Sequence, residues 1–219
     1  MDIIHFLSVK YTFFVVYGYK VSYIEFFGIL FNFFSVYLLA QDNILNWPIG
    51  NVGALLFSIL FYQMQLYSEV VQQIYFLIIG FYAWWIWSLK KEDGNEKDKD
   101  PTIKSLCVKH KIYCLLTILF GTIVMGYMMS HINTWLPKYF LNPASLPYID
   151  AFVTVMSFLA LTLMSHKNIE GWYLLALVYF VLIGVNWDKG LLLMILFFIA
   201  LLIIAIKGII NWNRLLVSE

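Results

Sequence analysis

Charge is scarce in this sequence, and the scarcity excludes most soluble folds. Of its 219 residues, 12% are charged, 62% are apolar and 19% are aromatic. A soluble domain is nearer a quarter charged and half apolar, and one core of this size could not hide so much apolar surface. The lipid bilayer is therefore the expected solvent. No basic face points to nucleic acid.

Several chemical signatures are also missing from the sequence. Its two cysteines, Cys107 and Cys114, have neither metal-site nor redox spacing, and there is no Walker A glycine loop. The apolar segments contain no Ser-His-Asp set and no paired carboxylates. We therefore expect no ATP hydrolysis, no cofactor, no metal and no enzymatic activity. A membrane-embedded enzyme acting on lipid is the alternative class.

Seven apolar stretches are long enough to cross a bilayer, which takes about 20 residues. They cover residues 22–40, 48–66, 68–88, 112–130, 149–166, 169–187 and 190–211. Residues 3–18 are also apolar, but the segment is short and carries His5 and Lys10. We expect it to be a helix lying in the membrane interface, with an eighth span as the alternative.

The distribution of lysine and arginine, which favour the cytoplasmic side, predicts the orientation. Residues 89–111 hold seven lysines and five acids and read as a solvated cytoplasmic linker. Ten basic residues then lie inside and four outside: Lys90, Lys91, Lys97, Lys99, Lys104, Lys109, Lys111, Lys167, Lys207 and Arg214 against Lys10, Lys20, Lys138 and Lys189. This predicts an external N-terminus and a cytoplasmic C-terminus in a bacterial inner membrane.

An internal repeat is the most informative feature of the sequence. Residues 23–87 overlay residues 148–212 without a gap, and fourteen positions are identical. Tryptophan pairs count for more than leucine pairs in an apolar chain, and two of them match: Trp47 with Trp172, and Trp87 with Trp212. Each copy would be a three-helix unit. One linking helix between the copies would insert both the same way up, as in transporters whose substrate site lies near the midplane between the halves.

These patterns divide the chain into six segments. They are an amphipathic N-terminal segment (1–21), a first repeat (22–88), the charged linker (89–111), a linking helix with an external loop (112–147), a second repeat (148–212) and a cytoplasmic tail (213–219). The predicted fold is thus an all-α membrane protein with seven transmembrane helices in a parallel 3+1+3 arrangement, plus the interfacial helix.

Both repeats contain distinctive motifs. They are Phe61-Tyr62-Gln63-Met64-Gln65-Leu66-Tyr67, Gln73 and Tyr82-Ala83-Trp84-Trp85-Ile86-Trp87 in the first repeat, and Tyr148-Ile149-Asp150 and Ser165-His166-Lys167-Asn168-Ile169-Glu170-Gly171-Trp172 in the second. These motifs resemble those of the PnuC family of vitamin uptake transporters. The resemblance implies a fold related to the SWEET sugar transporters, a homotrimer, and facilitated diffusion. It also implies that a cytoplasmic kinase traps the substrate by phosphorylation.

The expected substrate is a small vitamin with a cationic aromatic ring. Well-known members of the family carry nicotinamide riboside, but they have Trp and Asn where this chain has Leu175 and Tyr179, and Glu-Tyr where it has Phe197-Phe198. These departures favour thiamine, as in the thiamine-type (PnuT) members. Nicotinamide riboside is the alternative, and riboflavin stays open.

Ten residues are candidates for substrate contact. Trp and Tyr faces can hold a cationic ring, and polar side chains within the membrane usually face a cavity or another helix. The candidates are Gln73, which aligns with a glutamine of the family, then Gln72, Asn51, Tyr62, Tyr75, Tyr82, Trp84, Tyr179, and the repeat partners Asn32 and Ser157. Helix–helix hydrogen bonds are the competing role for the amides. Trp135, Trp187 and Trp212 are expected in interfacial belts, and Glu25 as a helix-start acid.

Overall fold

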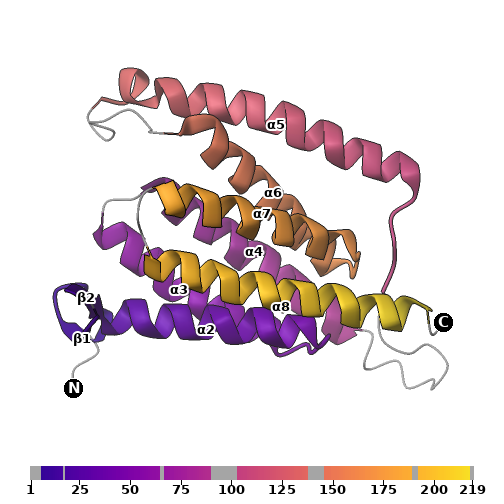
Figure 1. Cartoon of the computed structure of the whole chain (residues 1–219), viewed down its shortest axis with the longest axis horizontal. Helices are drawn as coiled ribbons and strands as arrows, with labels where there is room; N and C mark the ends of the chain where they lie inside the picture. Colours follow the sequence, from indigo (N-terminus) through magenta and orange to yellow (C-terminus); the bar gives the residue numbers. More distant parts are fainter. Residues whose placement is uncertain are drawn as a thin grey trace. The chain divides into compact units, whose positions relative to one another are not determined.

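A computed structural model describes residues 6–16, 18–64, 67–89, 103–137, 146–188 and 192–217 of the chain (Figure 1). Over these ranges it forms two short strands and seven long helices. The helices are α2 (Tyr23–Ala40), α3 (Asn46–Gln63), α4 (Tyr67–Leu89), α5 (Val108–Trp135), α6 (Pro147–Ser165), α7 (Glu170–Asp188) and α8 (Leu192–Val217).

Six of these helices are long and apolar enough to cross a membrane. The exception is α3, whose 18 residues include Asn46, Asn51 and Gln63. The helices coincide with the seven predicted stretches. However, α5 begins inside the predicted linker and continues to Trp135, into the predicted external loop. Residues 90–102 of the linker and 138–145 of that loop lie outside the described residues.

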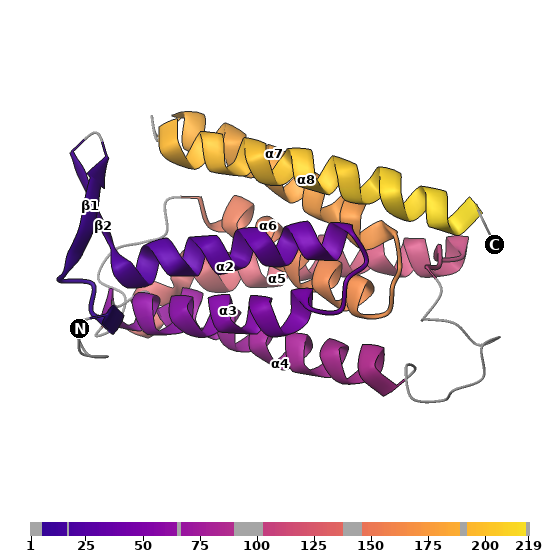
Figure 2. The same ribbon diagram turned by 90° about the horizontal axis from the view of Figure 1, so that it is seen from below.

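The N-terminal segment corrects the prediction of an interfacial helix. Thr12–Val16 (β1) and Tyr19–Ser22 (β2) instead form an antiparallel hairpin. β-Branched and aromatic residues dominate β1, and they favour strands over helices. Gly18 takes a positive φ of 83°, which suits glycine in a turn. The hairpin stands beside the start of α2 (Figure 2), so the chain is not purely helical.

By its internal contacts the chain divides into two compact units. The first comprises Met1–Thr102, Ser165–Lys167 and Lys207–Glu219, and the second Ile103–Met164 and Asn168–Ile206. In the first unit, α3 packs against both α2 and α4 (Figure 2). Ser22 begins α2 with a capping box, in which its hydroxyl accepts from the backbone N–H of Glu25. This arrangement brings the polar residues of α3 between two apolar helices.

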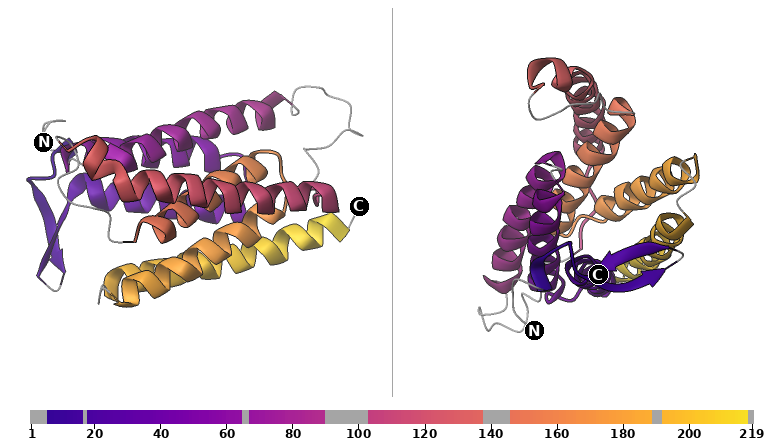
Figure 3. Two further views of the ribbon diagram at one scale, coloured as in Figure 1. Left: turned by 90° about the horizontal axis from the view of Figure 1, so that it is seen from above. Right: turned by 90° about the vertical axis from the view of Figure 1, so that its left-hand side faces the viewer.

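The helices of the second unit, α5, α6 and α7, can be followed in Figures 1 and 3. Two glycines of α5 contact side chains of α6. Gly121 lies against Val155, and Gly126 lies against the ring of Tyr148. Where α7 starts, Gly171 lies against Ala160 and Met164 of α6. Small residues let helices approach closely where the surrounding lipid gives little hydrophobic driving force.

The turns after α2 and α6 have the same backbone geometry. Asp42 and Lys167, which are 125 residues apart, both have φ of 55°. The backbone N–H of Asn43 donates to Leu38 over 3.0 Å, and that of its repeat partner Asn168 donates to Leu163 over 2.9 Å. The backbone N–H of Trp47 donates to the carbonyl of Ile44, and that of Trp172 donates to the carbonyl of Ile169. Helix ends follow the same offset, since α2 ends at Ala40 and α6 at Ser165.

One tryptophan departs from its expected place. Trp135 and Trp187 are exposed, in keeping with interfacial belts, but Trp212 is fully buried. Its repeat partner Trp87 is buried too. The belt assignment of Trp212 was therefore wrong, because the end of α8 packs within the first unit instead of facing outward.

Candidate functional site

Two asparagine–glycine contacts hold the polar interior of the first unit. Asn32 of α2 lies against Gly53 of α3, where a Cβ on the glycine would come within 2.6 Å of the Asn32 amide nitrogen. Asn51 of α3 lies against Gly80 of α4, where a Cβ would overlap the Asn51 amide oxygen. Only glycine leaves room for these amides, so both can sit between the helices.

The two asparagines differ in their hydrogen bonds. The Asn32 amide donates to the carbonyl of Gly28 over 2.9 Å, within its own helix. The Asn51 amide nitrogen is buried and has no hydrogen-bond partner among the described residues. A buried polar group without a partner is costly and rare. Asn51 is therefore the better candidate for donating a hydrogen bond to a ligand. The Asn32 amide already donates to a carbonyl of its own helix.

Gln73 lies on the same face of α4 as Gly80. The two are seven residues apart, which is about two helical turns or roughly 10 Å along the axis. Residue Gln73 is 7% exposed, equal to Asn51. Its neighbour Gln72 is half-buried. Asn51 and Gln73 thus place two amides along one buried face.

Three of the four predicted aromatic residues of the first repeat are exposed. Tyr62, Tyr82 and Trp84 expose more than a third of their surface, and Tyr75 is half-buried. Tyr82 packs edge-on against His166, with ring centroids 5.7 Å apart.

The second repeat presents an apolar interior at the equivalent positions. Ser157 is buried, but its hydroxyl donates to the carbonyl of Val153 within α6 over 2.8 Å. Tyr179 is buried and stacks on Phe198 of α8, with centroids 6.4 Å apart and ring planes at 25°. Phe198 occupies the repeat position of Gln73. This pair offers ring surface where the first repeat offers amides.

Sequence reasoning missed a buried cluster of charge and aromatic rings. The Lys167 ammonium contacts Asp42 Oδ2 at 2.6 Å and lies 4.3 Å from the ring centre of Trp87. Trp87 also packs edge-on against Trp47 and donates its Nε1–H to the carbonyl of Ser165 over 2.9 Å. One signal was present in the sequence: Asp42 and Lys167 carry opposite charges at the same repeat position.

Glu25, the predicted helix-start acid, is held by structural bonds. One carboxylate oxygen accepts from the Tyr19 hydroxyl at 2.8 Å, and the other lies 3.5 Å from the backbone N–H of Ser22. Burial and the hydrogen bond to Glu25 raise the pKa of Tyr19 to about 12. These bonds tie the hairpin to the start of α2.

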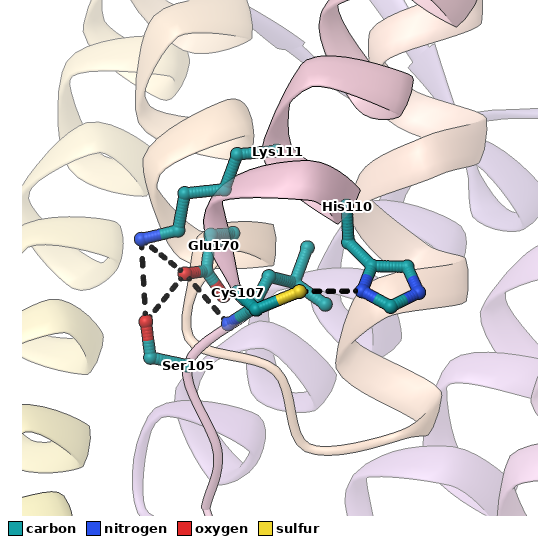
Figure 4. A network of polar contacts seen from close by, with 6 residues as sticks. Ser105, Cys107, His110, Lys111 and Glu170 are labelled. Carbon is teal, nitrogen blue, oxygen red and sulfur yellow. Dashed lines mark hydrogen bonds and ion pairs between the residues drawn. The ribbon is translucent and has the colours of Figure 1, made fainter.

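A second polar cluster, the α5 anchor, lies at the start of α5 (Figure 4). One oxygen of Glu170 accepts from the Ser105 hydroxyl at 2.8 Å and the Leu106 N–H at 3.0 Å, and it lies 3.0 Å from the Lys111 ammonium. Beside it, Cys107 Sγ lies 2.9 Å from His110 Nδ1. Hydrogen bonds from the backbone and side chain of His110 lower the pKa of the Cys107 thiol.

Comparison with known proteins assigns the chain to a family. The model of the nicotinamide mononucleotide transporter family matches residues 22–214, which include all seven helices up to the last turn of α8. The chain belongs to this transporter family. Membership confirms both the PnuC-type resemblance and the prediction that the protein is a transporter and not an enzyme.

Curated relatives and a solved structure agree with this assignment. The nicotinamide riboside transporters PnuC of Escherichia coli (strain K12) and Shigella flexneri are each 27% identical over 207 residues, covering 89% of this chain and 87% of the relative. The crystal structure of the vitamin B3 transporter PnuC shares the fold, with a TM-score of 0.67 and 22% identity over 90% of this chain and 83% of that one. The protein is therefore a multi-pass membrane protein. The names of its relatives favour nicotinamide riboside over thiamine.

Proposed function

We propose that the chain takes up nicotinamide riboside by facilitated diffusion. The family and the named relatives support this substrate. The structural observation that carries the proposal is the pair of buried amides on Asn51 and Gln73. A carboxamide and ribose hydroxyls need donors and acceptors, and a site built of such groups rejects ligands that leave them unpaired.

The spacing of the two amides suits a ligand of nucleoside size. Gly80, against which Asn51 lies, is about 10 Å along α4 from Gln73. One amide would bind the carboxamide and the other a ribose hydroxyl.

The predicted membrane topology gains support from the buried contacts of the first unit. Trp87 donates to Ser165, and Asn211 donates to the carbonyl of Ala40 over 2.9 Å, so the ends of α2, α4, α6 and α8 share one side. The chain leaves that side after Ala40 and returns to it by Trp87, which supports α3 as the seventh span. The basic linker favours this as the cytoplasmic side.

The repeated turn geometry supports two equivalent three-helix units joined by α5. Such units could expose a central site to one side at a time. The driving force would be the substrate gradient, kept steep by a cytoplasmic kinase, because the sequence has no recognised ATP-hydrolysing motif. A homotrimer and the coupling to a kinase remain predictions from the family resemblance.

Thiamine is the second candidate substrate. It is favoured by the apolar pair of Tyr179 and Phe198, which stand where the nicotinamide riboside carriers of this family are expected to have polar side chains. Thiamine also has a cationic aromatic ring, but it lacks the ribose. The two substrates therefore make different demands on Asn51 and Gln73.

Calorimetric titration of the purified protein tests the substrate directly. Nicotinamide riboside, thiamine, riboflavin and nicotinamide mononucleotide are compared, followed by counterflow in proteoliposomes without ATP or an ion gradient. We expect saturable binding and counterflow for nicotinamide riboside. Preference for thiamine would replace the first candidate with the second, and binding of none of the four would end the substrate assignment.

A further inference from the structure

The turns after α2 and α6 contact each other through side chains at equivalent positions. Asp42 and Lys167 are 125 residues apart, share φ of 55°, and form an ion pair with 2.6 Å between Lys167 Nζ and Asp42 Oδ2. Neither charge is needed to build its own turn, since the backbone bonds of the two turns match although the residues differ. The opposite charges instead serve the contact between the turns.

Burial distinguishes this ion pair from an ordinary surface pair. The Lys167 side chain is 3% exposed and that of Asp42 is 18% exposed, whereas Lys111 in the α5 anchor is 50% exposed. Removing one partner of a buried pair leaves an uncompensated charge and is strongly destabilising, while exposed pairs contribute little. The stability of the contact between the turns therefore depends on both charges.

Further bonds join the same two helix ends. Trp87, from the end of α4, lies under the Lys167 ammonium and donates to the last carbonyl of α6, that of Ser165. Asn211, near the end of α8, donates to the last carbonyl of α2, that of Ala40. Each repeat thus supplies a donor to the helix end of the other. We name Asp42, Lys167, Trp87, Ser165, Ala40 and Asn211 the turn latch.

We propose that the turn latch is the cytoplasmic gate of this carrier, closed in this structure, and that the Asp42–Lys167 pair separates when the site opens inward. The proposal rests on the proposed transport function. A site reached from one side at a time requires the ends of the two repeats to part on the other side. In the latch, charged groups join the ends of α2 and α6 directly. The strength of this contact therefore sets the equilibrium between the closed and open states.

Cysteine labelling in nanodiscs tests the gate without needing a substrate or a known orientation. Ala40 is buried, and Ala40→Cys is placed in a chain in which Cys107 and Cys114 are serine. The rate of reaction with a charged maleimide is then measured. We expect Lys167→Gln and Asp42→Asn each to raise this rate roughly tenfold, within the range of typical coupling between conformations.

Charge reversal supplies the decisive comparison. In Asp42→Lys with Lys167→Asp, each residue enters a backbone position that the other already occupies at the same φ, so the swap adds no new backbone strain. We expect slow labelling to return. Lys111→Gln, which breaks the exposed pair with Glu170, is the matched control and should change the rate by no more than about twofold.

Two further measurements keep the test decisive if a charge variant folds poorly. Trp87→Phe keeps the ring under Lys167 but removes the hydrogen bond to Ser165, and should raise labelling about fivefold. Ile24→Cys, buried near the other end of α2, should stay slow in every variant. The gate proposal would be wrong if the latch variants labelled at Ala40→Cys no faster than the Lys111→Gln control. It would also be wrong if labelling rose equally at Ala40→Cys and Ile24→Cys. A folded protein that gates but binds no nicotinamide riboside would overturn only the substrate.

Discussion

The two sequence repeats match at the turns after α2 and α6 but differ in the residues of their interiors. In the first repeat, Asn51 and Gln73 are buried amides, and Gly80 makes room for one of them. At the equivalent positions the second repeat has Ala176, Phe198 and Ala205. The turns and helix ends match, whereas the pair of amides occurs in the first repeat. Recognition of polar groups is therefore expected from the first repeat.

The repeats also differ at the start of their middle helices. Leu45 is exposed before α3, whereas its partner Glu170 begins α7 and holds the α5 anchor. In the second repeat this carboxylate contacts the residues that lead into α5 and the first turn of α5. The carboxylate adapts the second copy to the helix that joins the two.

The largest expected effect is on the unfolding free energy, and it compares Gly80 of the first repeat with its partner Ala205 in the second. Gly80→Val places side-chain atoms on the Asn51 amide and should lower the unfolding free energy by about 1–3 kcal/mol. Ala205→Gly removes one methyl group and should cost about 1 kcal/mol or less. Thermal midpoints followed by size-exclusion recovery would measure both. Equal losses would show that the two interiors are packed alike.

The next effect concerns binding by the first repeat. Gln73→Ala should weaken nicotinamide riboside binding by about 1–2 kcal/mol, roughly 5- to 30-fold, with little loss of folded protein, because one ligand hydrogen bond is lost. Gln72→Ala, a half-buried neighbour, is the matched control. Calorimetric titration checks both. Unchanged affinity in Gln73→Ala would remove this residue from the site.

A smaller effect on stability is expected when Leu45 and its repeat partner Glu170 are each replaced by the other residue type. Glu170→Leu makes the second repeat resemble the first, and removes the acceptor of Ser105, Leu106 and Lys111. We expect a loss of about 1 kcal/mol in unfolding free energy, since the ion pair is partly exposed and the remaining bonds are neutral. Leu45→Glu should change the thermal midpoint very little. If Leu45→Glu were the more harmful change, the anchor would not be specific to the second repeat.

The smallest effect is a shift in reactivity beside the α5 anchor. Because the pKa of Cys107 lies below that of an ordinary thiol, its alkylation should reach half-maximal rate at a lower pH than that of a free thiol. His110→Ala should move that midpoint upward only in part, since the backbone hydrogen bond from residue 110 remains. Alkylation rates against pH in a Cys114→Ser background would measure this. A midpoint unaffected by His110→Ala would show that the imidazole does not contribute.

Much of the fold was predictable from local patterns. Long apolar stretches predicted the helices, and the gapless overlay of residues 23–87 on 148–212 agrees with the matching turns at Asp42 and Lys167. The hairpin of β1 and β2 was not predicted, because a short apolar segment can form either a strand or a helix. In a helix that is hydrophobic all round, the sequence also shows no periodic pattern that would indicate which side packs against the other helices.

The candidate site was predicted only in part for the same reason. Gln73 was identified as the leading residue by its family motif, and it is buried. Nothing in the sequence distinguishes Asn32, which donates to its own helix, from Asn51, whose amide nitrogen has no partner in the described chain. That difference depends on which neighbour approaches each asparagine.

The sequence by itself determined the solvent, the number and length of the helices, and the duplicated turns, because these depend on composition and on short-range backbone preferences. Tertiary structure alone decided that Trp212 is buried, that the Asn51 amide nitrogen has no partner among the described residues, and that Asp42 contacts Lys167. Those outcomes depend on contacts between residues far apart in the chain. The local sequence of a helix that is apolar on all sides does not specify such contacts.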